Sequence, residues 1–326
     1  MAVDLQLLKP LCSGVAEFAE KDGLTVLHRF TPEERAVYTG HPDFGRKIYA
    51  TSGVKLEFQT DAKRFWLKGS FVTGSSRSFA GVDITVNGIL TEHFCCENIF
   101  DDPEVSLDVK LDGRLNTVAV YFPCVSGLML KDFAVEDFTR LTPPHPRRQM
   151  ICYGDSITQG YDARYPSLNY THQLAQALDM QMVNKAVGGE LFNPALAMAA
   201  SAGKPDLLTI AYGTNDWKHR SAEETLTAAR NFLTALFDRY PLTPALLFLP
   251  IWRKDRFETV PGGDFAALRQ SLQGVAAEFP QVTVIDPFAM IPHLAGFFSD
   301  GYLHPNDAGF AILGKNLVEA IRQIRI

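Results

Sequence analysis

The second half of the chain carries four short blocks whose residue types could together perform nucleophilic catalysis. Residues 154–158 place Ser156 in a turn after a short apolar run, and residues 184–189, 213–216 and 300–306 supply glycines, an asparagine and a histidine. A serine hydroxyl is a weak nucleophile until a base removes its proton, and histidine titrates in the range that this task needs. The order serine, glycine, asparagine, histidine therefore offers a nucleophile, hydrogen-bond donors and a base.

Each block alone has a simpler structural explanation. A serine in a strand-to-helix turn is usually a helix cap, Asn215 or Asp216 could make an Asx turn, and His304-Pro305 could open a helix. Thr158 stands where the Gly-x-Ser-x-Gly elbow of α/β-hydrolases has its second glycine, so that motif is absent here. The simpler explanations do not account for four complementary groups that all fall at the ends of expected strands or helices.

As a set, the four blocks resemble those of the SGNH (GDSL) hydrolases, and the resemblance covers residues 149–326. It implies that Ser156 is the nucleophile, His304 its base, and Gly189 and Asn215 members of an oxyanion hole together with the Ser156 amide. Such donors lower the barrier because the tetrahedral intermediate carries negative charge on the former carbonyl oxygen. This chemistry requires neither a metal nor another cofactor.

The third member of the triad departs from the family pattern. The family has an aspartate three residues before the histidine, whereas Asp300 precedes His304 by four, and position 301 is a glycine. We expect Asp300 to orient the imidazole, because the flexible Gly301 could absorb one added loop residue. A different acid, or a backbone carbonyl that leaves a serine–histidine dyad, are the alternatives.

Two tryptophans near these blocks are candidates for substrate binding. Trp217 directly follows the asparagine block, and Trp252 follows an expected strand. A tryptophan exposed at a strand end could stack on a sugar ring, and packing in the core is the alternative for both. Asp155 is expected to brace the turn before the serine rather than to take part in chemistry.

The elements around the blocks alternate short apolar runs with helical periodicities, as in a parallel sheet covered by helices on both faces. Functional residues in such a sheet belong at the carboxyl ends of its strands. Ser221 and Glu224 form a capping box, and Asn306 can cap a last helix. With the resemblance, this predicts a three-layer α/β/α, flavodoxin-like domain. The expected strands are residues 149–153, 182–187, 207–212, 245–249 and 282–285.

The first part of the chain predicts a second, all-β domain. Short runs of β-branched and aromatic residues recur between turn signals, and Asn87-Gly88 is a strong hairpin signal. We expect a sandwich or jelly roll over residues 1–141, a proline-rich linker at 142–148 and the hydrolase domain at 149–326.

A motif in this first domain also has a counterpart. Residues 81–85, Gly-Val-Asp-Ile-Thr, resemble the Gly-x-Asp-Leu-Tyr motif of a β-sandwich domain found ahead of some SGNH domains. Certain carbohydrate acetyl esterases share this order of domains, which implies an acylated sugar as substrate. The alternative is that the domain only stabilises or oligomerises the enzyme.

Composition limits the binding partners and the cellular compartment that we expect for this protein. The net charge is −6 and no dense basic cluster with interleaved aromatics is present, so we expect no nucleic-acid partner. The N-terminus does not read as a secretion signal, and the richest apolar stretch is too short to span a bilayer, so we expect no membrane partner. Five cysteines without metal-site spacing favour a reduced, cytoplasmic setting and argue against a metal.

These observations predict a serine esterase that removes a short acyl group, such as acetyl, from a carbohydrate through an acyl-serine intermediate. A small-molecule or carbohydrate ester is the expected partner, and assembly into a homo-oligomer is left open. An acyltransferase, a thioesterase or a lysophospholipase with the same site is the first alternative. A non-catalytic carbohydrate-binding protein is the second.

Overall fold

The computed structural model describes residues 3–145, 147–199 and 204–324, and the chain divides into two compact units. Unit 1 comprises Met1–Thr31, Gly40–Arg147 and Arg164–Ser167, and unit 2 comprises Pro32–Thr39, Arg148–Ala163 and Leu168–Ile326. The main division therefore falls at the end of the expected linker. Two short segments are exchanged between the units. Pro32–Thr39 belongs to unit 2 although its flanking sequence is in unit 1, and Arg164–Ser167 belongs to unit 1 although its flanking sequence is in unit 2.

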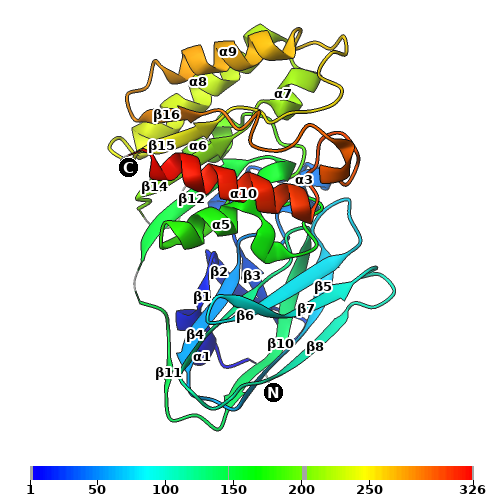
Figure 1. Cartoon of the computed structure of the whole chain (residues 1–326), viewed down its shortest axis with the longest axis vertical. Helices are drawn as coiled ribbons and strands as arrows, with labels where there is room; N and C mark the ends of the chain where they lie inside the picture. Colours follow the sequence, from blue (N-terminus) through cyan, green and yellow to red (C-terminus); the bar gives the residue numbers. More distant parts are fainter. Residues whose placement is uncertain (1–2, 146, 200–203, 325–326) are drawn as a thin grey trace. The chain divides into compact units, whose positions relative to one another are not determined.

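Unit 1 consists of two antiparallel sheets around a common core (Figure 1). The first sheet has the order β1 (Cys12–Ser13), β4 (Lys55–Thr60), β9 (Asn116–Tyr121), β6 (Ala80–Val86) and β7 (Ile89–Cys96), with β11 (Leu141–Thr142) paired to β4. The second has the order β2 (Glu17–Lys21), β3 (Leu24–His28), β10 (Ser126–Glu136), β5 (Arg64–Thr73) and β8 (Glu104–Lys110). Short helices α1 (Leu5–Leu8) and α3 (Pro42–Lys47) complete the unit.

Alternation of apolar and polar residues explains how these strands form a sandwich. In β8 the side chains of Val105, Leu107 and Val109 are buried, and every residue between them is exposed. The predicted hairpin at Asn87-Gly88 is present between β6 and β7, and both residues have positive φ, as a two-residue hairpin turn requires. The prediction of an all-β first domain is confirmed.

Unit 2 is built on a parallel sheet with helices on both faces (Figure 1). The strand order is β13 (Met180–Asn184), β12 (Arg148–Gly154), β14 (Leu207–Ala211), β15 (Ala245–Phe248) and β16 (Val282–Ile285). Helices α5 (Tyr170–Ala177) and α10 (Asp307–Arg322) lie against one face. Helices α6 (Pro194–Met198), α8 (Ala222–Arg239) and α9 (Phe265–Ala276) lie against the other. The predicted α/β/α class is confirmed.

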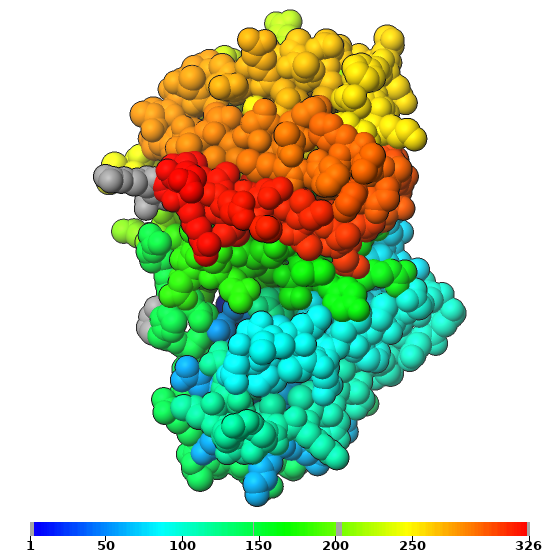
Figure 2. Space-filling view, in the orientation of Figure 1, coloured from blue at the N-terminus to red at the C-terminus, as the bar shows by residue number. Residues whose placement is uncertain are grey.

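Local signals in the sequence set the ends of several helices. The capping box is formed at the start of α8, where the Ser221 side chain accepts from Glu224 N and the Glu224 carboxylate accepts from Ser221 N. The Asn306 side chain caps α10 by accepting from Gly309 N. The outer side of α10 lies on the molecular surface (Figure 2), while Phe310, Leu313, Leu317 and Ile321 pack inward.

The strand order determines where side chains from different strands converge. The first strand of the sheet, β12, pairs with β13 on one side and with β14 on the other. The order therefore reverses at β12, and in open parallel sheets such a reversal creates a crevice at the carboxyl ends of the strands. The loops after β12, β13 and β14 carry the first three sequence blocks.

Two further features are the hydropathy of the helices and the state of the cysteines. Within the described residues, no helix is both long and apolar enough to cross a membrane. All five cysteines are free thiols, and Cys96, Cys124 and Cys152 are buried.

Candidate active site

Ser156 lies at a tight turn between β12 and the short helix α4 (Ser156–Gln159). The Asp155 side chain caps this helix by accepting a hydrogen bond from Ile157 N at 2.9 Å. A Cβ at Gly154 would lie 2.2 Å from the Thr158 hydroxyl, so only glycine allows Thr158 to pack against the end of the strand. The sequence Gly154 to Thr158 thus builds a turn that presents Ser156 at the carboxyl end of β12.

The structure brings the three residues of the expected triad into one hydrogen-bonded chain. Ser156 Oγ lies 2.9 Å from His304 Nε2, and His304 Nδ1 lies 2.6 Å from Asp300 Oδ2. Gly301 has a φ of +74°, a left-handed conformation that turns the loop back between the aspartate and the histidine. The four-residue spacing therefore still places Asp300 against the imidazole, and neither another acid nor a backbone carbonyl occupies that place.

The Asp300 carboxylate is well prepared to stay ionised. Burial raises its pKa, but hydrogen bonds from the His304 ring and the Leu303 and Tyr302 amides outweigh burial and hold the pKa below its ordinary value. The imidazole is also packed on its face, because the Tyr161 ring stacks on His304 with centroids 5.5 Å apart. These contacts fix the ring so that Nε2 points toward Ser156.

The glycine block after β13 lies beside the same turn. Gly188 N donates to Gln159 Oε1 at 2.7 Å, and Val187 N donates to Gly154 O at 3.0 Å. A Cβ at Gly188 would lie 2.4 Å from the Tyr161 ring, and Gly189 has a φ of +87°. Both glycines are therefore required by the backbone path, which brings this loop to the helix that begins at Ser156.

Asn215 belongs to the third block and joins this loop through its side chain. It lies in α7 (Thr214–His219), and its Nδ2 donates to Glu190 O at 3.0 Å. An amide nitrogen carries two hydrogens, so one donor remains for a substrate oxygen. Gly189 and Asn215 thus lie on the two loops that flank the loop of Ser156, because β13 and β14 are the neighbours of β12.

Asp216 fixes the helix that carries Asn215. Its buried carboxylate accepts hydrogen bonds from Phe192 N at 3.2 Å and from Arg220 at 2.9 Å. Burial raises the pKa of Asp216 to about 6, and the Arg220 charge limits the rise.

Asp155 is a buried acid next to the serine. Burial raises its pKa to about 7, and the hydrogen bond from Ile157 N opposes this rise. A small cavity of about 30 Å³ lies beside it and is otherwise lined mostly by apolar side chains, including Phe248 and Leu313. The helix-capping geometry agrees with a bracing role for Asp155.

The two tryptophans are placed differently from the expected substrate contacts. Trp217 is fully buried, its indole N–H donates to Gly263 O at 2.8 Å, and its ring packs against Phe265. Trp252 is also buried and stacks on His293 with centroids 5.3 Å apart. The prediction of sugar stacking on these rings is wrong for this structure, because both indoles fill the core, as the alternative had it.

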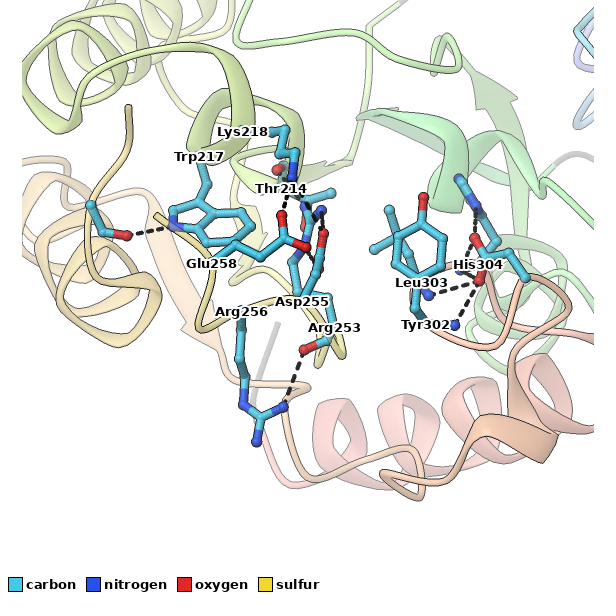
Figure 3. A network of polar contacts seen from close by, with 12 residues as sticks. Thr214, Trp217, Lys218, Arg253, Asp255, Arg256, Glu258, Tyr302, Leu303 and His304 are labelled. Carbon is cyan, nitrogen blue, oxygen red and sulfur yellow. Dashed lines mark hydrogen bonds and ion pairs between the residues drawn. The ribbon is translucent and has the colours of Figure 1, made fainter. Parts of the chain in front are cut away.

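The buried side chain of Arg253 contacts α7, the helix that carries Asn215 (Figure 3). Arg253 donates to Thr214 O at 2.9 Å, binds the Asp255 carboxylate through two nitrogens and lies 4.6 Å from the centre of the Trp217 ring. The next residue, Lys254, donates its backbone N–H to Tyr302 O at 2.9 Å. The loop after β15 therefore links the helix of Asn215 with the loop that carries the histidine.

Neither Glu190 nor Tyr38 was predicted from the sequence to belong to this site. Glu190 directly follows the paired glycines and is buried, and its carboxylate accepts a hydrogen bond from the Tyr38 hydroxyl at 2.6 Å. An acid that follows a glycine pair at a strand end is a weak signal for Glu190. No local pattern marks Tyr38, which lies 152 residues away in the chain.

Within residues 3–145, 147–199 and 204–324, no group of three or more histidine, cysteine, aspartate or glutamate side chains is arranged to hold a metal ion.

Comparison with known proteins agrees with this geometry. Residues 152–312 match the GDSL-like Lipase/Acylhydrolase family. The second half of the chain therefore contains a GDSL-type hydrolase domain. None of the curated protein sequences compared with the chain matches it.

Solved structures with the same fold span both units. The salicylyl-acyltransferase SsfX3 from a tetracycline biosynthetic pathway has a TM-score of 0.79 at 20% identity, with 96% of this chain and 94% of that one covered. A family two carbohydrate esterase from Cellvibrio japonicus gives 0.63 at 16% identity, covering 97% and 96%. A family two carbohydrate esterase from Clostridium thermocellum, in complex with cellohexaose, gives 0.64 at 16%, covering 83% and 91%.

Proposed function

We propose that this protein is a serine esterase that removes a short acyl group, such as acetyl, from a carbohydrate, with Ser156 as nucleophile. The observation that carries the proposal is the hydrogen-bonded chain from Ser156 through His304 to Asp300 at the carboxyl end of β12. A base within hydrogen-bond reach of a serine, itself oriented by an ionised carboxylate, is the arrangement that acyl transfer to a hydroxyl requires.

The first half of the reaction forms an acyl-serine. Ser156 Oγ attacks the ester carbonyl carbon while His304 Nε2 takes the hydroxyl proton, and the carbonyl oxygen becomes an oxyanion. The Ser156 and Gly189 amides and the Asn215 side chain would donate hydrogen bonds to this oxyanion. Collapse of the intermediate breaks the bond to the alcohol, which leaves with the proton from His304.

The second half releases the acid. His304 takes a proton from a water molecule, whose oxygen attacks the acyl carbon. The new tetrahedral intermediate then breaks its bond to Ser156 Oγ, which recovers the proton from His304. Asp300 stabilises the imidazolium in both halves, because its carboxylate stays ionised beside Nδ1.

The substrate class rests on the order of the domains and on similar folds. The carbohydrate esterases reported above share the fold over 83% and 97% of this chain, and one of them was solved with cellohexaose bound. An acyltransferase is the second candidate, because the fold is also that of the salicylyl-acyltransferase. We also propose a cytoplasmic location, which the five free cysteines support.

Hydrolysis of aryl esters of increasing acyl length tests the proposal. We expect turnover of the acetyl ester by the wild type, a decline with chain length, and loss of turnover in a folded Ser156→Ala variant. Acetylated oligosaccharides then test the alcohol part of the substrate. Unchanged activity in Ser156→Ala would refute the serine mechanism, and acyl groups on an added alcohol instead of water would favour the acyltransferase.

A further inference from the structure

The segment Pro32–Thr39 belongs to unit 2, although the sequence on both sides of it forms the β-sandwich. It consists of helix α2 (Pro32–Ala36) and the turn that follows. Two of its side chains reach the loop after β13. Glu34 forms a buried ion pair with Lys185, and the Tyr38 hydroxyl donates to Glu190 Oε1.

These two contacts hold both ends of the glycine loop. Lys185 directly follows β13 and Glu190 directly follows Gly189, so the residues between them include the proposed oxyanion donor. Both side chains of the ion pair are almost fully buried, at 0% and 1% exposed, and Glu190 is 2% exposed. Water therefore competes little with either contact, and a charged group removed from water keeps its partner strongly.

Glu190 joins the two loops that supply donors to the oxyanion. Its carboxylate also accepts hydrogen bonds from Asn193 Nδ2 at 2.8 Å and from the Tyr212 hydroxyl at 3.3 Å. Its backbone oxygen accepts from Asn215 Nδ2 at 3.0 Å. A shift of Glu190 would therefore move the Gly189 amide and the Asn215 side chain together.

We infer that Tyr38 and Glu190 are positioning residues for the oxyanion hole, and that the segment Pro32–Thr39 is a part of the catalytic machinery. The inference rests on the proposed function, because it assigns these residues to the transition state of that reaction. Neither side chain needs to touch the substrate. Tyr38 fixes the Glu190 carboxylate, and Glu190 fixes the two donors.

The first test compares Tyr38→Phe with Tyr240→Phe. Tyr240 is also buried in unit 2, and its hydroxyl has no hydrogen-bond partner among the described residues. Rates are expressed per active site titrated with a phosphonate, so unfolded protein does not count. We expect Tyr38→Phe to lower kcat about tenfold or more with KM within about twofold, because small displacements of catalytic groups cost rate. Tyr240→Phe should keep both parameters near the wild type.

Two readouts separate positioning from a loss of stability. A trifluoromethyl ketone adds to the serine and leaves an oxyanion, so its affinity should fall in Tyr38→Phe by about the same factor as kcat. In an Asn215→Ala background, Tyr38→Phe should cost less than it does in the wild type, since part of its effect acts through Asn215 and residues that act through one group are not additive. Glu190→Gln should show the same two effects.

The outcomes are distinct from those for the proposed function. If Ser156→Ala loses turnover but Tyr38→Phe keeps kcat within about twofold, the proposed function stands and the inference fails. An undiminished effect of Tyr38→Phe in the Asn215→Ala background, or unchanged affinity for the ketone, also overturns the inference. If Ser156→Ala keeps its turnover, the proposed function fails, and the inference fails with it.

Discussion

Replacing Asp155 with asparagine should make the stability of the protein less dependent on pH. Asparagine is as good a helix cap as aspartate, so Asp155→Asn keeps the bond to Ile157 N and removes only the charge. The wild-type carboxyl has a pKa raised by burial to about 7, against an ordinary value of 3.8. Between these values the folded state holds a proton that the unfolded state has lost, so stability falls as pH rises.

The size of the effect follows from this shift. Each pH unit between the unfolded and folded pKa values costs about 1.4 kcal/mol, so the whole window costs about 4 kcal/mol and the part above about pH 5 costs about 3 kcal/mol. Above the folded pKa both states are ionised, and the cost is constant. Relative to the wild type, the free energy of unfolding of Asp155→Asn should therefore rise by about 3 kcal/mol between about pH 5 and about pH 8.

Urea unfolding at both pH values, with wild type and variant measured side by side, checks this prediction. Asp238→Asn is a suitable control, because Asp238 lies on the exposed side of α8. The control should differ from the wild type by no more than about 0.5 kcal/mol at either pH. A difference between Asp155→Asn and wild type that is the same at both pH values would refute the reasoning from burial.

Two further predictions concern the triad and the buried ion pair. Asp300→Asn should lower kcat by about 10³-fold or more while KM changes little, since a neutral partner at Nδ1 cannot stabilise the imidazolium; steady-state kinetics per titrated site measures this, and a loss below about tenfold would favour a dyad. Lys185→Met should destabilise unit 2 by about 3 kcal/mol, because it leaves the Glu34 carboxylate buried without its partner. Adding Glu34→Gln should recover much of that loss in urea unfolding, and no recovery would contradict a specific pairing.

Local signals in the sequence were sufficient for most of the strands and for the longer helices of unit 2. The strand predicted at residues 282–285 has the observed bounds of β16, and the caps at Ser221 and Asn306 begin the observed helices. The predicted strand at 182–187 is longer than β13, which ends at Asn184. Residues 185–187 instead enter the glycine loop, whose path depends on contacts with Gln159 and Gly154 that no local pattern contains.

The residues of the candidate site also differ in whether the sequence could predict them. Ser156, Gly189, Asn215 and His304 could be selected because their four blocks together resemble those of a known family, and each block lies at the end of an expected element. The burial of Trp217 and Trp252 could not be predicted, since burial of a tryptophan depends on the distant residues that pack around it. Arg253 and Phe265 cover Trp217, and His293 and Phe298 cover Trp252.

The first domain shows the same limit. Strands β4, β5, β6, β8, β9 and β10 match the runs predicted at residues 54–58, 65–71, 81–86, 105–109, 115–122 and 128–135, whereas β1, β2 and β3 were not predicted. In β2 the residues are half-buried or exposed throughout, so neither an apolar run nor a regular alternation marks it. The membership of Pro32–Thr39 in unit 2 is equally invisible, because it depends on Lys185 and Glu190, which lie far along the chain.

That membership also bears on the order in which the protein is made. Tyr38 leaves the ribosome 152 residues before Glu190, which at ordinary rates of synthesis is roughly 8 to 30 s. During this interval Glu34 and Tyr38 have no partner loop to bind. If the sandwich folds during this interval, its strands pair without the segment Pro32–Thr39. That segment can pack only after the loop after β13 has been synthesised.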